Sequence, residues 1–439
     1  MRHAARLETC VICALLLAVG LFSFERARQL RYDFHHFYRD ARYVWDHAAL
    51  NPVLKADDEV AQRQLPFYLP VVPLALAPLT AGGVTSAAVL WAALQTASLA
   101  AALHEIRRRW VSSAGAFWLA VACGLPVIYE AAFFNQLSFP ILALCLLAIR
   151  FVQSNKTISA AASLSVACIT KLLPAMLIVW LAMQRPRGWL RTCAMTLLFA
   201  AIFALVPCYL AFGMAETHKY LAQWVEHNGG SSRAFDLLDP QIDEHFLGHA
   251  NQSIRAVVAR WTWPEHPFRL PRQPIELSRS ASDTLAQILT VTLCAIWIAL
   301  TLRVSKRPAD IRRSPGGAHS ELIPSANDAT QQSHVDCTAL SSAAIWMIGM
   351  LVFSPLMRQY YLIWAWPAVA LLADQSLRSI ATRTPRCAWV GLGAWLIGMA
   401  IWPMPLVRLA GAHLAMLIVV AICAGLIATA KRVTRGASV

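Results

Sequence analysis

Apolar runs of about 15–24 residues recur from one end of the chain to the other, and this pattern excludes most folds. A helix of about 20 apolar residues crosses the hydrocarbon core of a bilayer, where only helices and closed barrels satisfy their backbone hydrogen bonds. Hydrophobic residues make up 58% of the chain and charged residues only 14%, against about 25% in soluble domains. We therefore expect an all-α, polytopic membrane helix bundle rather than a soluble domain, a disordered chain or a secreted disulfide scaffold.

The apolar runs predict twelve transmembrane helices within a single domain, residues 1–439. They lie at about 9–24, 85–104, 113–129, 137–152, 157–169, 172–184, 190–213, 284–302, 339–353, 359–374, 388–403 and 409–430. The termini and connections on one side carry 21 of the 38 Lys and Arg residues, and short connections on the other side carry three. Because short cytoplasmic loops are enriched in Lys and Arg, the first side is predicted to be cytoplasmic. The net charge of +14 follows this topology, so no nucleic acid partner is expected.

This topology places both termini in the cytoplasm of a bacterium, with the chain as a multi-pass protein of the plasma (inner) membrane. Two long loops, residues 25–84 and 214–283, then lie on the outer, periplasmic face. Residues 304–338 are rich in Ser, Pro and Ala, which predicts a flexible cytoplasmic linker.

Two proline-containing segments interrupt the regular pattern. Residues 66–81 are apolar but contain four prolines, which predicts a re-entrant or interfacial segment. Lys171 and Pro174 divide residues 157–184 into two half-length spans. Broken helices at membrane depth occur only against protein or a water-filled cavity, so we expect Lys171 to face a cavity.

The first outer loop opens with acidic, histidine and aromatic residues close behind the first span. Asp33 lies about nine residues beyond that span, where a carboxylate can act as general base on an acceptor beside a lipid-anchored donor. The alternative is a solvated amphipathic helix at the membrane surface. The spacing of His35, His36 and His47 matches no strong metal-binding pattern, so no metal site and no cofactor are predicted, while a divalent metal stays open as an alternative.

Three cations on the outer side are candidate phosphate-binding residues: Lys171, Arg255 and Arg358. An ionisable residue inside a membrane indicates a functional site by default, and arginine pairs with phosphate through two parallel hydrogen bonds. Snorkelling, solvation and interfacial anchoring are the structural alternatives. The amides of Asn135, Gln136, Asn251 and Gln252 are candidate sugar-binding groups, with helix capping as their alternative.

Motifs in the same order occur in a known enzyme family. They are Asp33-Phe34 with Tyr38 and Ala41, Asn51-Pro52, the proline-rich stretch from Tyr68 to Leu79, Asn135-Gln136-Leu137, Lys171-Leu-Leu-Pro174, Asn251-Gln252-Ser253-Ile254 with Arg260, and Ser354-Pro355. The chain resembles the polyprenol-phosphate-mannose-dependent mannosyltransferases of glycosyltransferase family 87, within the GT-C superfamily. The family usually has Gly-Gln where this chain has Asn135-Gln136. It tends to place Trp and His after Ser-Pro, where residues 357–360 here are Met-Arg-Gln-Tyr.

The resemblance implies a membrane glycosyltransferase that moves a hexose, by family default mannose, with inversion. The donor would be a polyprenyl-phosphate sugar, and the acceptor a lipid or glycan at the outer face of the bilayer. Asp33 would be the base, and Lys171, Arg255 and Arg358 would bind the donor phosphate. The other expected substrate-binding residues are His36, Tyr38, Asn135, Gln136, Asn251, Gln252, Gln359 and Tyr360, and residues 66–81 would shape a groove for the polyprenyl tail.

Three other functions fit parts of the pattern. A ligase or polymerase of the O-antigen type would also act on lipid-linked glycans at the outer face. A lipid or solute transporter would have a dozen spans, but we would expect its charges near the midplane and its loops short on both sides. A non-catalytic membrane scaffold is the third alternative.

Overall fold

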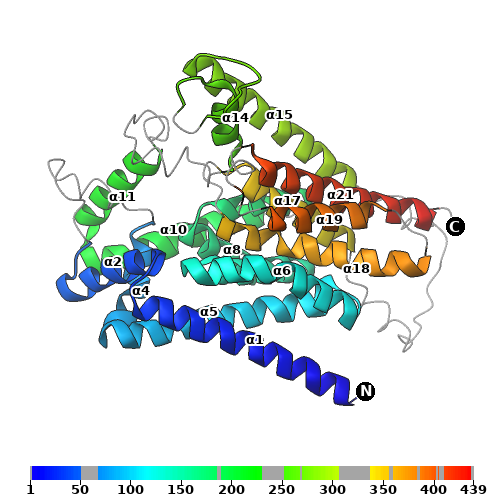
Figure 1. The fold of residues 1–439 in the computed structure, drawn as a ribbon. Coiled ribbons are helices and arrows are strands. Elements are labelled where there is room, and N and C mark those ends of the chain that lie inside the picture. The colour runs from blue at the N-terminus through cyan, green and yellow to red at the C-terminus, as the bar shows by residue number, and fades with distance from the viewer. Residues whose placement is uncertain are drawn as a thin grey trace, which may run out of the picture.

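The computed structural model describes residues 2–50, 68–184, 189–229, 252–266, 269–305, 337–354, 359–382, 386–401, 404 and 410–436. Within these ranges every regular element is a helix, which confirms the all-α prediction. Most of the long helices run side by side, and both termini lie at the same end of the bundle (Figure 1). We call this the terminal end and the opposite end the distal end.

The apolar helices form the body of the bundle. They are α1 (Arg2–Arg28), α5 (Gly83–Glu105), α6 (Ala114–Phe134), α7 (Ser138–Gln153), α8 (Thr157–Thr170), α9 (Met176–Gln184), α10 (Trp189–Phe212), α15 (Arg279–Ser305), α17 (Cys337–Val352), α18 (Trp366–Thr382), α19 (Cys387–Ala400) and α21 (Ala412–Gly436). The α1 helix packs on α5, α7 packs between α5 and α8, and α18 packs between α6 and α19. Large buried side chains such as Trp91, Trp366 and Trp395 fill the spaces between them.

Shorter elements connect or cover these helices. They are α2 (Asp33–His47), α4 (Val71–Leu76), η1 (Ala77–Thr80), η2 (Ile106–Trp110), η3 (Leu173–Ala175), α11 (Met214–Gly229), α14 (Ile254–Thr262) and η4 (Gln359–Ala365). The α2 helix packs on α4 and η1, and α14 packs on α15. Figure 1 shows α2 and α11 at the distal end and α14 beside the tip of α15, away from α2.

Five helices of the described ranges are long and apolar enough to cross a membrane: Arg6–Arg28, Gly83–Trp110, Ala114–Phe134, Leu190–Phe212 and Arg279–Leu302. Shorter apolar helices of 10–17 residues accompany them. Within the described residues, each of the twelve predicted ranges overlaps helical structure. The segment from Val71 to Thr80 is about 15 Å long at 1.5 Å per residue, roughly half the thickness of the hydrocarbon core, so it is too short to cross.

The third predicted span ends too early in the sequence-based scheme. The prediction ended this span at residue 129, but α6 continues to Phe134 and has Pro126 in its interior. The helix ends only at Asn135, which adopts the left-handed conformation. Tyr129 and Glu130 are therefore the last helical turns of α6, and only Asn135 and Gln136 lie beyond its end.

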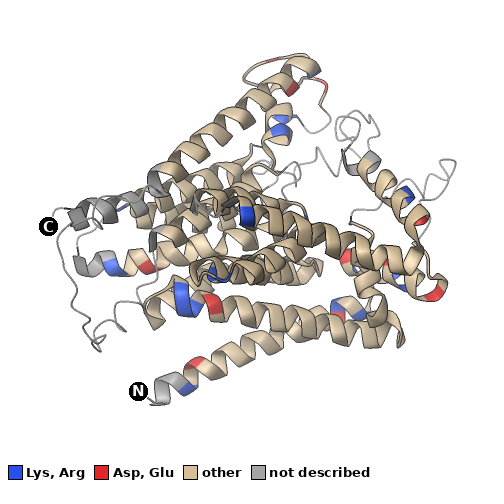
Figure 2. Ribbon diagram, turned by 180° about the vertical axis from the view of Figure 1, so that it is seen from behind, with Lys and Arg blue, Asp and Glu red and all other residues tan. Residues whose placement is uncertain are grey.

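Charged side chains gather near the ends of the helices, and the middle of the bundle is mostly uncharged (Figure 2). At the terminal end, the buried carboxylate of Glu105 pairs with Arg109 at 3.3 Å and with Arg150 at 2.8 Å. Arg107 of η2, which directly follows α5, pairs with Glu8 of α1 at 2.9 Å. These ion pairs fix the register of four helices at that end.

Candidate functional site

The α2 helix begins at Asp33 and is amphipathic. Its buried residues are Phe34, Phe37, Ala41 and Val44, which share one face at helical spacing. Tyr32 precedes the helix with φ 55° and ψ −140°. Asp33 is partly buried, and its Oδ2 atom is shielded from solvent. The predicted surface helix therefore exists, and it directs its first carboxylate inward rather than into bulk water.

Tyr68 faces Asp33 from the start of the proline-rich segment. Its hydroxyl donates a hydrogen bond to Gln136 Oε1 at 3.2 Å, and its ring lies 4.8 Å from the ring of Phe37. Burial raises the pKa of Tyr68 well above 10, and the negative charges of Asp33 and Tyr361 raise it further. Tyr68 is thus a neutral hydrogen-bond donor at physiological pH.

Asn135 and Gln136 join three helices at the end of α6. Asn135 has φ 52° and ψ 42°, a conformation that glycine and asparagine adopt at the lowest cost. This explains why asparagine replaces the glycine that is usual in the family. Its side chain accepts from Trp91 Nε1 at 3.2 Å and donates to the carbonyl of Ser23 at 3.0 Å. Asn135 is fully buried, so it positions the neighbouring Gln136.

Lys171 lies where the chain leaves α8 and turns into η3. Its backbone is extended, with φ −157° and ψ 131°, because Pro174 three residues later ends the regular helix. The Nζ atom lies 3.9 Å from the ring centroid of Tyr361, 5.8 Å from that of Tyr360 and 6.0 Å from that of Trp364. Among the described residues, no carboxylate pairs with Lys171 within 4.0 Å.

These contacts bring segments remote in sequence together at the distal end. Asp33 and Tyr361 both act electrostatically on Tyr68, Tyr68 binds Gln136, and Tyr361 lies against Lys171. We call Asp33, Tyr68, Gln136, Tyr361 and Lys171 the distal-end site. It contains one potential base, one cation and two hydroxyl groups.

An apolar pocket adjoins the distal-end site beneath α2. Its walls come from α2, α5 and the proline-rich segment: Phe34, Phe37, Tyr38, Ala41, Leu76, Leu79, Thr80, Ala87 and Trp91. Of the predicted substrate-binding residues on α2, Tyr38 lines the pocket, and His36 is partly buried. Burial, followed by the charges of Arg39 and His35, lowers the pKa of His36. His36 is therefore uncharged at neutral pH.

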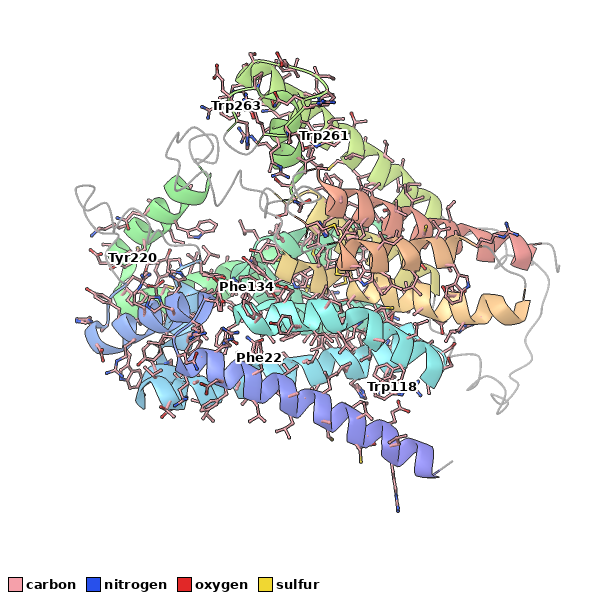
Figure 3. The ribbon with its side chains drawn as sticks, viewed as in Figure 1. Phe22, Trp118, Phe134, Tyr220, Trp261 and Trp263 are labelled. Atoms are coloured by element: carbon pink, nitrogen blue, oxygen red, sulfur yellow. The ribbon has the colours of Figure 1, made fainter. Side chains whose placement is uncertain are left out.

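The α14 part of the second outer loop lies apart from the distal-end site (Figure 1). Arg255 on α14 makes a bidentate ion pair with Asp283 on α15, with both N–O distances 2.9 Å, and Gln252 is fully buried beside Ser253, the residue that caps α14. Figure 3 labels Trp261 and Trp263 in this region, whereas Phe134 lies near the distal end of α6. The predicted phosphate-binding role of Arg255 is thus separated from Asp33 and Lys171 in this structure.

Arg260 of α14 is fully buried, and burial lowers its pKa to about 10. His266 lies close to Arg260 and is 2% exposed. Burial and then the charge of Arg260 lower the pKa of His266 to about 4. His266 is neutral at physiological pH, which relieves repulsion next to the buried guanidinium.

Three predicted residues are not fully placed. Asn251 and Arg358 lie outside the described residues, and Gln359 is described only as the first residue of η4. Tyr360 is 9% exposed, and its ring lies 5.0 Å from the ring of Phe134. Tyr360 therefore borders the distal-end site, and its role in substrate binding stays a prediction.

The sequence analysis missed two members of the site, Tyr68 and Tyr361. Tyr68 was visible only as part of a motif, and Tyr361 only as the neighbour of Tyr360. A tyrosine at a membrane interface is common, so residue type alone gives no signal. Within the described ranges, no group of three or more His, Cys, Asp or Glu residues could hold a metal ion.

Comparison with known proteins identifies the family. None of the curated proteins matches the chain. Among solved structures, the crystal structure of ArnT from Cupriavidus metallidurans bound to undecaprenyl phosphate is similar over 97% of this chain and 79% of that chain, at 13% identity and a TM-score of 0.37. That score is too low for residue-by-residue comparison. The sequence model of glycosyltransferase family 87 matches residues 65–316, more than half of the 439 residues. The chain therefore belongs to glycosyltransferase family 87, and it is a glycosyltransferase built from membrane-embedded helices.

Proposed function

We propose that this enzyme transfers a hexose, mannose by family default, from a polyprenyl-phosphate donor to a lipid-linked or glycan acceptor. Transfer inverts the anomeric carbon and takes place at the outer face of a bacterial inner membrane. The distal end faces the periplasm, and both termini lie in the cytoplasm. The ion-paired arginines of the terminal end support this orientation, because basic residues concentrate on the cytoplasmic side of bacterial membrane proteins.

The proposal is supported by a series of interactions that links Asp33 to Lys171. Asp33 and Tyr361 each interact electrostatically with Tyr68, and Lys171 Nζ lies 3.9 Å from the ring centroid of Tyr361. Asp33 and Lys171 are 138 positions apart in sequence. A base and a cation held in one partly buried site are the two groups that displacement of a phosphate from a sugar requires.

In this mechanism Asp33 removes the proton from the acceptor hydroxyl. The oxygen then attacks the anomeric carbon from the side opposite the phosphate, and the bond between that carbon and the phosphate oxygen breaks. Polyprenyl phosphate leaves with the electron pair. Lys171 stabilises the negative charge that develops on the leaving phosphate. Asp33 also lies at the N-terminus of α2, where the helix dipole favours negative charge.

The surrounding residues orient the substrates. Tyr68 keeps its proton and donates to Gln136, so the pair presents fixed polar groups to a sugar. Tyr360 lies beside Lys171, with 5.8 Å from Nζ to its ring centroid. Tyr360, Gln359 and His36 are proposed as further substrate contacts.

The proline-rich segment, whose Leu76 and Leu79 line the apolar pocket beneath α2, is proposed to shape a groove for the polyprenyl tail, since apolar surface removed from water is stabilising at about 25 cal/mol per Å². Arg255, Arg358, Asn251 and Gln252 stay as proposed contacts of the second outer loop and the segment before η4.

The substitution Asp33→Asn tests the proposal. It preserves size and removes the base, and we expect transfer from a labelled polyprenyl-phosphate mannose to fall by about 10²- to 10⁴-fold. The matched control is Asp46→Asn, which removes a carboxylate from the same helix, where Asp46 pairs with Arg42 at 2.8 Å. Transfer at the wild-type rate in Asp33→Asn would eliminate Asp33 as the base and with it this mechanism.

A further inference from the structure

Arg26 near the distal end of α1 is held by aromatic rings. Its guanidinium carbon lies 4.4 Å from the ring centroid of Phe133, 5.2 Å from that of Phe22 and 5.5 Å from that of Tyr32. Stacking on rings is favourable for a guanidinium and leaves the N–H groups at its edge available for an anion.

The acid next to Arg26 in sequence binds other residues. Glu25 accepts hydrogen bonds from Arg28, at 3.1 and 3.2 Å, and from Gln29. Across the described ranges, no carboxylate lies within 4.0 Å of a nitrogen of Arg26. Arg26 is therefore a preorganised cation whose described neighbours are rings rather than counter-charges, as is Lys171.

The position of Arg26 along α1 matches the depth of lipid phosphates. The candidate span Arg6–Arg28 has 23 residues and a length of about 35 Å, slightly more than the hydrocarbon core of about 30 Å. Arg26 thus lies at the headgroup level of one leaflet. The side chain of Arg26 is itself only partly buried, so it is accessible at that depth.

A row of rings connects Arg26 to the distal-end site. Tyr32 lies 5.3 Å from Phe134, and Phe134 lies 5.0 Å from Tyr360, which flanks Lys171. Figure 3 shows Phe22 on α1 and Phe134 on α6 at this part of the bundle. Tyr32 has a positive φ of 55°, a backbone conformation that costs energy. This conformation places its ring beside Arg26 while the next residue, Asp33, starts α2.

We propose that Arg26 binds the phosphate of the polyprenyl-phosphate donor at a lateral entrance between α1 and α6. This inference rests on the proposed function and adds an entry site to it. The donor arrives from the bilayer with its phosphate at headgroup depth, contacts Arg26 first, and then moves along the aromatic row to Lys171. Arg26 therefore determines donor capture, and Lys171 stabilises the charge formed during transfer.

Kinetics of Arg26→Gln test this division of roles. We expect KM for the polyprenyl-phosphate sugar to rise about 10-fold or more, since a hydrogen bond to a charged group contributes about 1.5–3 kcal/mol, with kcat within about 3-fold of wild type. Arg26→Lys keeps the charge but loses the bidentate geometry, so a smaller rise is expected. The control Arg31→Gln removes an exposed charge three residues beyond α1 and leaves KM unchanged.

Direct measurements of lipid binding distinguish a site for polyprenyl phosphate from a general site for phospholipid headgroups. They also distinguish a failure of this inference from a failure of the proposed function. Wild-type protein in nanodiscs should bind undecaprenyl phosphate more tightly than Arg26→Gln does, whereas phosphatidylglycerol binding should be equal in both. Equal loss of both lipids would make Arg26 a general headgroup anchor and overturn the inference. If Arg26→Gln keeps the donor KM and the undecaprenyl phosphate affinity while Asp33→Asn is inactive, the entrance is wrong and the proposed function stands. If Arg26→Gln fails to accumulate, the same measurements on Arg26→Lys decide: unchanged KM and affinity would overturn the inference.

Discussion

Selected cations at the two ends of the bundle have different kinds of neighbour. At the terminal end, arginines pair with carboxylates: Glu105 binds Arg109 and Arg150, and Arg378 binds Asp374 at 2.9 Å. At the distal end, Lys171 and Arg26 lie over aromatic rings. The arginines of the first group are neutralised within the protein, whereas no carboxylate of the described residues lies within 4.0 Å of a nitrogen of Lys171 or Arg26.

This difference distinguishes charges that stabilise the fold from charges that stay available to bind a substrate. A buried carboxylate that holds two arginines links helices, and its loss leaves buried charge uncompensated. A cation on a ring gains only about 0.5–2 kcal/mol from that contact and keeps its capacity to bind an anion. The terminal end is therefore expected to determine stability, and the distal end to determine catalysis. The following predictions test that contrast.

Glu105→Gln should cause the largest effect and act on stability alone. Glu105 is 2% exposed, so its loss leaves Arg109 and Arg150 without their shared partner and costs about 3–5 kcal/mol. Thermal unfolding in detergent measures this change. The control Glu216→Gln removes an exposed pair with Lys219 and should change stability by less than about 1 kcal/mol. If folded Glu105→Gln enzyme showed strongly reduced sugar transfer, the proposed division between a stabilising terminal end and a catalytic distal end would be contradicted.

Lys171→Gln should act on catalysis alone. Removing one fixed group that stabilises developing charge lowers kcat by about 10²- to 10³-fold, while the melting temperature changes little. Steady-state transfer assays measure kcat, with Lys156→Gln as a control because Lys156 is exposed in the turn before α8. If Lys171→Gln instead raised KM for the donor and left kcat normal, Lys171 would have the donor-capture role that we propose for Arg26.

Acidification should loosen the segment around α14 through His266. Its pKa is about 4 in the folded protein against 6.5 ordinarily, so the unfolded segment binds the proton first as pH falls. Stability is full above pH 6.5 and declines by about 3 kcal/mol as pH falls from 6.5 to 4. Hydrogen exchange of the backbone amides of residues 269–283 at pH 7 and 4.5 measures this loss of stability. His266→Gln removes this contribution, and an unchanged pH dependence in that variant would rule out His266.

Substitutions at Asn135 should give the smallest effect and show how the site is positioned. Both Asn135→Gly and Asn135→Ala lose the hydrogen bonds to Trp91 and Ser23. Alanine also suffers from the φ of 52°, so Asn135→Ala should be less stable than Asn135→Gly by about 1 kcal/mol. Denaturation of the two variants measures the difference, and equal stability would show that the backbone conformation relaxes.

Sequence patterns predicted the helices well because long apolar runs in a bilayer have few alternatives. The end of α6 was wrong by about five residues, since tyrosine and glutamate at 129–130 read as polar turn residues, yet they fit the last helical turns at an interface. The break in the apolar pattern predicted that Lys171 faces a cavity and binds a phosphate, and this role stays a prediction. Its aromatic neighbours were not predicted, because Tyr361 lies 190 residues away in the sequence.

The order of residues by itself determined the helical class, the predicted spans and the family, since each depends on local composition or on short motifs. Only the tertiary structure decided which polar residues meet. Packing of α2 against α4 and η1 turned Asp33 inward beside Tyr68, whereas it left Arg255 bound to Asp283 in another part of the molecule. The physical reason is that contacts between distant segments depend on how whole helices pack, and a single sequence carries no local signal for that packing.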